Sequence, residues 1–230
     1  MKEVGTLSVV ATPIGNLGDI TLRALETLKN ADAIACEDTR VSSKLLARFD
    51  ISKPLLIYHA RSGRLNAERV LALLAEGKRV ALLTDAGTPG ISDPGAELVA
   101  LARERLGGSV RIEAIPGASA LTAALSVAGV PAPSFLFLGF LPHKKGRLTL
   151  FKEIALEERA VVFYESPHRI VKALESLAEV AGEREVAVCR ELTKIHEEVA
   201  RGTARELASD FAARPDAKRK GEFVVVISAK

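Results

Sequence analysis

The chain contains no glutamine and no tryptophan, a single methionine and only three asparagines, at positions 16, 30 and 66. Scarce amides and methionine are typical of heat-adapted proteins, although codon bias produces the same pattern. Cysteine is almost as rare, since Cys36 and Cys189 are the only two. Two cysteines can form at most one disulfide bond, which is too few to stabilise 230 residues, so a scaffold built on disulfides is excluded.

Long apolar runs are also missing. Apolar runs such as Val80–Leu83 and Val224–Ile227 are far shorter than a membrane span. Residues 1–5 are not followed by the apolar stretch that a signal peptide needs. We therefore expect a soluble cytoplasmic protein with no membrane partner, in which both thiols are reduced and buried.

The composition that is present indicates a folded globular chain. Apolar residues make up 48% and charged residues 27% of the 230 positions, which excludes a disordered chain. This length can bury the core of one large α/β domain or of two small ones. The net charge of +3 is too small to attract a polyanion by itself, so the placement of the cations matters more than their sum.

Short apolar runs alternate with amphipathic helical patterns along the first half. We predict strands over 7–11, 33–36, 55–58, 79–84 and 110–115, and helices over 21–30, 65–76, 97–106 and 118–128. This alternation predicts a mostly parallel sheet flanked by helices.

A proline-rich segment interrupts that pattern. Gly129, Pro131 and Pro133 resist regular structure, so we place a domain boundary at this segment, with domains 1–130 and 131–230. In the second half we predict strands over 135–138, 160–164, 185–189 and 223–227, and helices from about 148, over 169–180 and over 204–213. The fold class is therefore α/β, with two α/β domains.

Ligands of parallel sheets bind at the carboxyl ends of the strands, so the loops that follow the strands are the candidates for a site. The loop 85–95 has three glycines, two prolines and two aspartates, and it is long for a plain connection, which favours a binding site. The loop 12–19 can press its backbone against a ligand, or Asp19 can simply cap the next helix. The segment 116–120 opens a small-residue helix, which suits either a ligand or tight helix–sheet packing.

Charged residues mark two further sites. Glu37 and Asp38 end the second strand beside Arg40, and either acid could act as a base. The alternative is that Asp38 caps a helix and Glu37 is solvated. The basic loops 143–147 and 218–220 could form a cationic rim for phosphates, although a single basic loop is usually only solvated surface.

The sequence lacks the motifs of several common metal, nucleotide-binding and catalytic sites. The cysteines and histidines show no CxxC or HxxxH spacing, so a zinc site is not expected. The phosphate loop GxxxxGK[ST], the nucleophile elbow GxSxG and a GxGxxG turn after the first strand are all missing.

Seven ordered motifs together resemble a known family. They occupy residues 10–21, 35–40, 84–95, 115–120, 138–142, 163–169 and 189–194. Over nearly its whole length, the chain resembles the 2′-O-methyltransferases of small-subunit 16S ribosomal RNA, a branch of the tetrapyrrole-methylase superfamily. The resemblance implies a class III methyltransferase fold, with S-adenosylmethionine bound in a cleft between two α/β domains, usually in a homodimer.

The resemblance also implies site residues. Those implied for the cofactor are Pro13, Ala86, Gly87, Thr88, Ile91, Ser119, Ala120 and Leu192. Glu37 falls where relatives acting on small molecules carry an acid near the substrate.

The implied reaction is methylation of the ribose 2′-oxygen of a cytidine in the decoding centre of 16S rRNA. Our hypothesis makes Glu37 or Asp38 the proton acceptor, with no metal ion required. We expect the cations that steer the RNA phosphates to be Arg40, Lys144, Lys145, Arg147, Arg169 and Lys194.

Two other functions stay open. One is a sister methylase acting on a small molecule such as a tetrapyrrole, or on a modified residue of a translation factor. The other is a non-enzymatic assembly protein that binds rRNA on a relic of the fold.

Overall fold

The protein is represented by a computed structural model, which describes residues 4–59 and 63–230. The chain divides between Ser119 and Ala120 into two compact units, each with its own sheet. The division falls before the boundary that the prolines predict between residues 130 and 131. The reason is helix α5 (Ala120–Val127), which packs against strand β10 (Phe223–Ile227) of the second unit.

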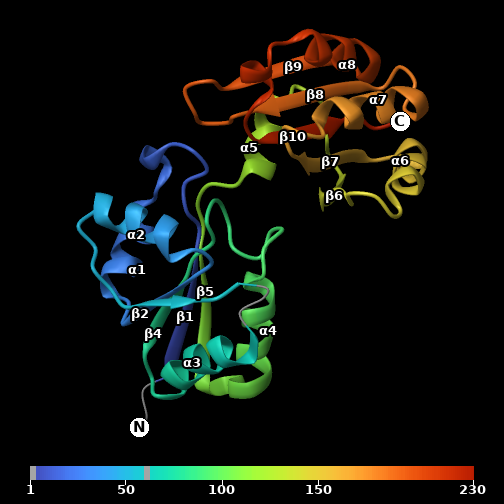
Figure 1. Cartoon of the computed structure of the whole chain (residues 1–230). Helices are drawn as coiled ribbons and strands as arrows, with labels where there is room; N and C mark the ends of the chain where they lie inside the picture. Colours follow the sequence, from blue (N-terminus) through green and yellow to red (C-terminus); the bar gives the residue numbers. More distant parts are fainter. Residues whose placement is uncertain (1–3, 60–62) are drawn as a thin grey trace. The chain divides into compact units, whose positions relative to one another are not determined.

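The first unit is built on a five-stranded parallel sheet, as the βα alternation predicts (Figure 1). Its strands are β1 (Gly5–Val10), β2 (Ala33–Cys36), β3 (Leu55–Ile57), β4 (Arg79–Leu82) and β5 (Val110–Ile115). They are ordered β3-β2-β4-β1-β5, and every pair is parallel. The carboxyl ends of β2, β4, β1 and β5 are therefore consecutive along one edge of the sheet.

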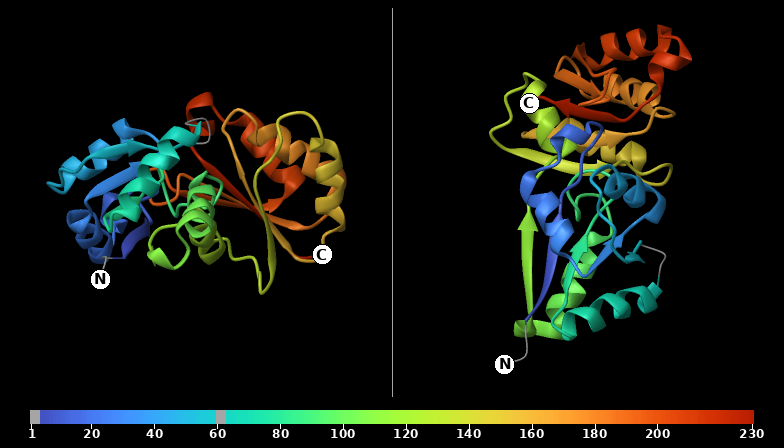
Figure 2. Two further views of the ribbon diagram at one scale, coloured as in Figure 1. Left: turned by 90° about the horizontal axis from the view of Figure 1, so that it is seen from below. Right: turned by 90° about the vertical axis from the view of Figure 1, so that its left-hand side faces the viewer.

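Helices cover both faces of this sheet (Figures 1 and 2). They are α1 (Leu22–Asn30), α2 (Thr39–Arg48), α3 (Gly63–Ala75) and α4 (Gly95–Leu106), with short 3-10 turns at Leu17–Asp19 and Gly107–Ser109. Leu28 of α1 and Leu46 of α2 share one core with Ile34. Leu74 of α3 and Leu98 of α4 share a second core, and the sheet therefore lies between two helical layers.

The second unit has a mixed sheet in the order β6-β7-β10-β8-β9. Its strands besides β10 are β6 (Phe135–Phe140), β7 (Ala160–Glu165), β8 (Glu185–Arg190) and β9 (Glu198–Thr203). Strand β6 runs parallel to β7, whereas β10 is antiparallel to both β7 and β8, and β9 is antiparallel to β8. The sheet thus departs from the parallel arrangement of the first unit.

One face of the second sheet is covered by helices α6 (Arg147–Leu156), α7 (Ile170–Val180) and α8 (Ala204–Ala213). Phe151, Leu174 and Phe211 pack there against Phe163 and Val225 of the sheet. A 3-10 turn, Asp216–Arg219, follows α8. Across residues 4–59 and 63–230, no helix is long and apolar enough to cross a membrane.

Candidate functional site

The loops after β1, β4 and β5 are tied together by hydrogen bonds. The N–H of Thr12 donates to the carbonyl of Gly87 at 2.9 Å, and the N–H of Gly87 donates back at 3.1 Å. The Thr88 hydroxyl donates to the carbonyl of Ala118 at 3.1 Å. Loops that are far apart in the sequence therefore form one ordered structure at the carboxyl edge of the sheet.

Glycine is required where these loops approach one another. Gly87 has a φ of +85°, and a Cβ at this position would lie 3.3 Å from Cγ2 of Ile14. A Cβ on Gly117 would lie 3.0 Å from the Cβ of Ala11. Both contacts are tighter than a side chain normally tolerates, so the sequence keeps glycine at these points.

Asp93 holds the second part of the long loop. Its carboxylate accepts from the N–H of Gly90, at 2.9 and 2.8 Å from its two oxygens, and from the N–H of Gly95 at 2.7 Å. Ser92, between them, has a left-handed φ of 65°. The aspartate thus fixes the turn that leads into α4, as an Asx-type side chain commonly does.

Carboxylates from two neighbouring strands gather at the same edge. Glu37 and Asp38 follow β2, and Asp85 follows β4. The N–H of Asp38 donates to Oδ1 of Asp85 at 3.1 Å, and the Thr84 hydroxyl lies 3.5 Å from Oε2 of Glu37. Asp85 is not among the site residues that the sequence predicts, because the order of motifs along the chain does not reveal that β2 lies beside β4.

The two acids that follow β2 have opposite pKa shifts. Burial raises the pKa of Glu37, and the negative charges of Asp85 and Asp93 raise it further. Hydrogen bonds from the side chain and backbone of Arg40 lower the pKa of Asp38 to about 2. The environment therefore makes Glu37 the more basic carboxylate of the pair.

Asp38 also has a structural role. Its side chain accepts from the N–H of Arg40 at 2.8 Å and caps α2, and its carboxylate pairs with the Arg40 guanidinium at 2.6 Å. The helix cap that the sequence left open for Asp38 is therefore confirmed.

The residues expected at the cofactor are divided between the two units. Pro13, Ala86, Gly87, Thr88, Ile91 and Ser119 lie in the first unit, in or directly after the loops described above. Ala120 opens α5 of the second unit. Leu192, in the second unit, lies in the loop after β8 and is 7% exposed. Its neighbours Glu191 and Thr193 both have left-handed φ angles, 50° and 67°.

Three of the cations expected at the RNA are partly buried and engaged by carboxylates. Arg147 and Arg169 bind opposite oxygens of Glu165 at 2.9 and 2.7 Å, and the Glu165 side chain is fully buried. Lys194 binds Glu191 at 2.8 Å and Glu222 at 2.9 Å. A buried carboxylate is costly unless it is paired, so the two contacts of Glu165 serve the fold.

The other three expected cations lie at the surface. Arg40 is exposed although it pairs with Asp38, and Lys144 and Lys145 are exposed in the loop before α6. Lys144 and Lys145 are thus accessible to an RNA backbone.

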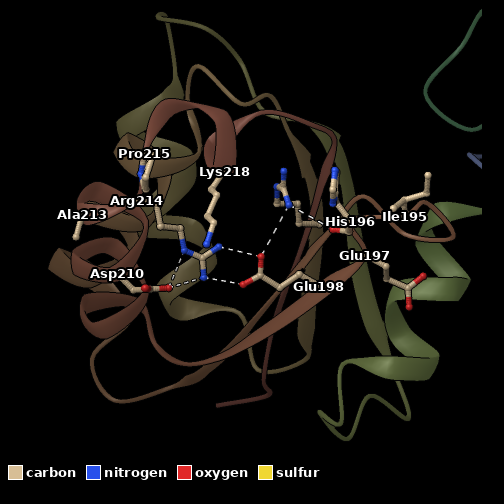
Figure 3. A pocket seen from close by; sticks show the side chains of 10 residues that line it. Ile195, His196, Glu197, Glu198, Asp210, Ala213, Arg214, Pro215 and Lys218 are labelled. Carbon is tan, nitrogen blue, oxygen red and sulfur yellow. Dashed lines mark hydrogen bonds and ion pairs between the residues drawn. The ribbon is translucent and has the colours of Figure 1, made fainter.

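The second unit also holds a charged pocket of about 930 Å³ beside the end of β8 (Figure 3). In it, Arg214 lies between Asp210, at 2.6 Å, and Glu198, at 2.7 Å. Both ion pairs of Arg214 are formed with acids of the pocket itself. We therefore assign the pocket no part in the reaction. Within the described residues, no cluster of three histidine, cysteine or acidic side chains is arranged to hold a metal ion.

Comparison with known proteins places the chain in a family. The model of the tetrapyrrole (corrin/porphyrin) methylases matches residues 6–208. A ribosomal RNA small subunit methyltransferase I from Thermotoga maritima is 45% identical over 227 residues, covering 99% of this chain and 100% of that protein. The protein of the same name from Xylella fastidiosa is 47% identical over 232 residues, covering 99% and 82%.

Solved structures show the same fold at lower identity. The methyltransferase CobJ superposes with a TM-score of 0.70 at 22% identity, covering 98% of this chain and 94% of that one. A diphthine synthase also gives 0.70, at 19% identity and coverages of 97% and 90%. The chain therefore belongs to the tetrapyrrole methylase family of methyltransferases and, within it, to the branch of the ribosomal RNA small subunit methyltransferases I.

Proposed function

We propose that the chain transfers a methyl group from S-adenosylmethionine to the ribose 2′-oxygen of a cytidine in the decoding centre of 16S rRNA. The similarity to ribosomal RNA small subunit methyltransferases I over nearly the whole chain carries this proposal. We further propose that the substrate is the RNA within the small ribosomal subunit, and that the enzyme acts in the cytoplasm as a homodimer.

The carboxyl-edge loops fit S-adenosylmethionine chemically. Asp85 follows β4 at this edge, and a carboxylate there suits the positively charged sulfonium and ammonium of this cofactor. Gly87 and Gly117 allow these loops to pack closely against Ile14 and Ala11. When bound, the cofactor supplies the methyl group that is transferred.

We assign the cofactor contacts to the loop residues that the resemblance implies. They are Pro13, Ala86, Gly87, Thr88, Ile91, Ser119, Ala120 and Leu192.

We assign the proton acceptor to Glu37. A ribose hydroxyl is a weak acid, so a base that takes its proton as the oxygen bonds to carbon helps the reaction. The raised pKa of Glu37 makes it a better base than Asp38, whose carboxylate is held by Arg40. Holding the hydroxyl in line with the methyl carbon supplies a large further part of the rate.

Two measurements separate this proposal from the alternatives. Calorimetry with S-adenosylmethionine should give saturable binding, whereas its absence would favour a non-enzymatic assembly protein. With tritiated S-adenosylmethionine, label should enter small subunits from a strain that lacks the modification. Label that instead enters a tetrapyrrole or a translation factor, and not the RNA, would favour a sister methylase.

A further inference from the structure

Aromatic rings are rare in this chain but gather at one place in the second unit. The chain has eight phenylalanines, two tyrosines and no tryptophan, and three of these ten rings form one cluster. The ring of Tyr164 lies 5.0 Å from Phe137 and 5.4 Å from Phe140, both in edge-to-face geometry. Phe140, at the end of the cluster, is 58% exposed.

A bulge in β6 aims Phe140 toward this cluster. The register with β7 pairs Phe137 with Val162 and then Phe140 with Tyr164, so β6 has one residue more than β7 in this interval. Gly139, inside it, has a φ of +60°. In a regular strand, Phe137 and Phe140 would point to opposite faces, whereas the extra residue brings both rings to Tyr164.

Buried contacts hold the chain on both sides of the ring. On one side, Phe140 pairs with Tyr164 of β7 in the strand register. After Phe140, the carbonyls of Leu141 and Pro142 accept from Arg169 at 3.0 Å and from Arg147 at 3.2 Å. Both arginines are fixed by Glu165, so the exposed ring is presented on a rigid support.

Two exposed lysines follow the ring in the same loop, Lys144 and Lys145. An exposed aromatic ring beside cations is the arrangement by which proteins bind unpaired nucleotides, since the base stacks on the ring and the cations contact phosphates. Strand β6 lies at the edge of its sheet, beside β7 (Figure 1).

We propose that Phe140 stacks on an unpaired base of the RNA substrate, and that Lys144 and Lys145 contact the adjacent phosphates. This proposal rests on the proposed function and deepens it, because it locates an RNA contact in the second unit. The other occupant that an exposed phenylalanine could accept is a second copy of the chain, and the test includes that outcome.

The absence of tryptophan provides a direct probe. Phe140→Trp creates a protein with a single tryptophan, whose fluorescence a stacked base quenches. The matched control is Phe135→Trp, at the opposite end of the same strand and 38% exposed. Titration of both full-length variants with a single-stranded oligocytidylate should quench the first saturably and leave the second nearly unchanged. Equal quenching of the two, or none in either, would overturn the stacking proposal.

Affinity gives the second test. Phe140→Ala should raise the Kd for the oligocytidylate about 5- to 150-fold and raise the KM for small subunits, with the Kd for S-adenosylmethionine unchanged. The double variant Lys144→Ala/Lys145→Ala should reduce the slope of log K against log salt by about 1.4, since each phosphate contact on a single strand contributes about 0.7. An unchanged Kd in the first variant and an unchanged slope in the second would each contradict the proposal.

Sedimentation of the same variants identifies the competing occupant. If Phe140→Ala alters the oligomeric state, the ring belongs to an interface between copies of the chain and the stacking proposal is overturned. The wild-type protein shows which proposal has failed. If it neither binds nor methylates rRNA, the proposed function is wrong, whereas normal wild-type activity with an unaffected Phe140→Ala variant removes only the stacking contact.

Discussion

Glu37 and Asp38 are adjacent in the chain, yet their carboxylates have opposite surroundings. Glu37 is partly buried near Asp85 and Asp93, which raises its pKa, while Arg40 lowers that of Asp38. The sequence identified both acids as candidate bases but could not choose between them. The choice depends on which groups the fold brings near each one, and Asp85 comes from a different strand.

The first prediction concerns the base itself. Glu37→Gln should lower kcat for methyl transfer about 10²- to 10⁴-fold, the usual contribution of a general base, while the Kd for S-adenosylmethionine measured by calorimetry changes little. Asp38→Asn is the matched control, because asparagine also caps helices well, and it should keep most of the activity. Full turnover by the Glu37 variant would show that it is not the base.

The second prediction concerns pH. Glu37 must be ionised to accept a proton, and its pKa is raised above the ordinary 4.5. As the pH falls through this raised pKa, Glu37 becomes protonated, so the rate at saturating substrate should begin to fall at a higher pH than an ordinary glutamate would give. Rates measured from neutral to acidic pH test this. The same acidic decline in the residual activity of Glu37→Gln would assign it to another group.

Among the secondary-structure elements, the buried Glu165 joins three segments. It ends β7, binds Arg147 at the start of α6 and binds Arg169 before α7. The two arginines in turn fix the loop after β6 through its carbonyls. The sequence identified both arginines as surface cations, since nothing in a basic motif reveals that its partner is a buried acid on another strand.

The third prediction tests this junction. Glu165→Gln should lower the free energy of unfolding by about 3–5 kcal/mol, because it leaves two partly buried arginines without their counter-ion. Urea denaturation measures the change. Glu68→Gln, which breaks the exposed pair with Arg105, is the control and should leave the midpoint nearly unchanged. Similar midpoints for the two variants would mean that Glu165 does not stabilise the junction.

Elements with a strong apolar pattern were predictable, and two without one were not. The buried strands β1, β2, β4, β7, β8 and β10 follow short apolar runs of the kind that marks a core strand. Helix α2 was not among the predicted helices, although a helix capped by Asp38 was left open, because few of its residues are apolar and it buries only Ser42 and Leu46. Strand β9 was not predicted either, because Glu198, Arg201 and Gly202 interrupt any apolar run.

For the molecule as a whole, the net charge of +3 is small for a protein that acts on RNA. Several of its cations are also paired with carboxylates of the fold. Arg147, Arg169, Lys194 and Arg214 are all held by carboxylates. Attraction to RNA therefore depends on local exposed groups such as Lys144 and Lys145, not on a general positive surface.

The proposed reaction of the whole enzyme is methylation of a ribose in small-subunit RNA. It is tested by incubating the protein and tritiated S-adenosylmethionine with small subunits from a strain that lacks the modification, and then mapping the labelled nucleotide. We expect a single labelled cytidine in the decoding centre of 16S rRNA, methylated at the 2′-oxygen, with the label greatly reduced for Glu37→Gln. Label on a base, on another nucleotide or on a ribosomal protein would refute the proposed reaction.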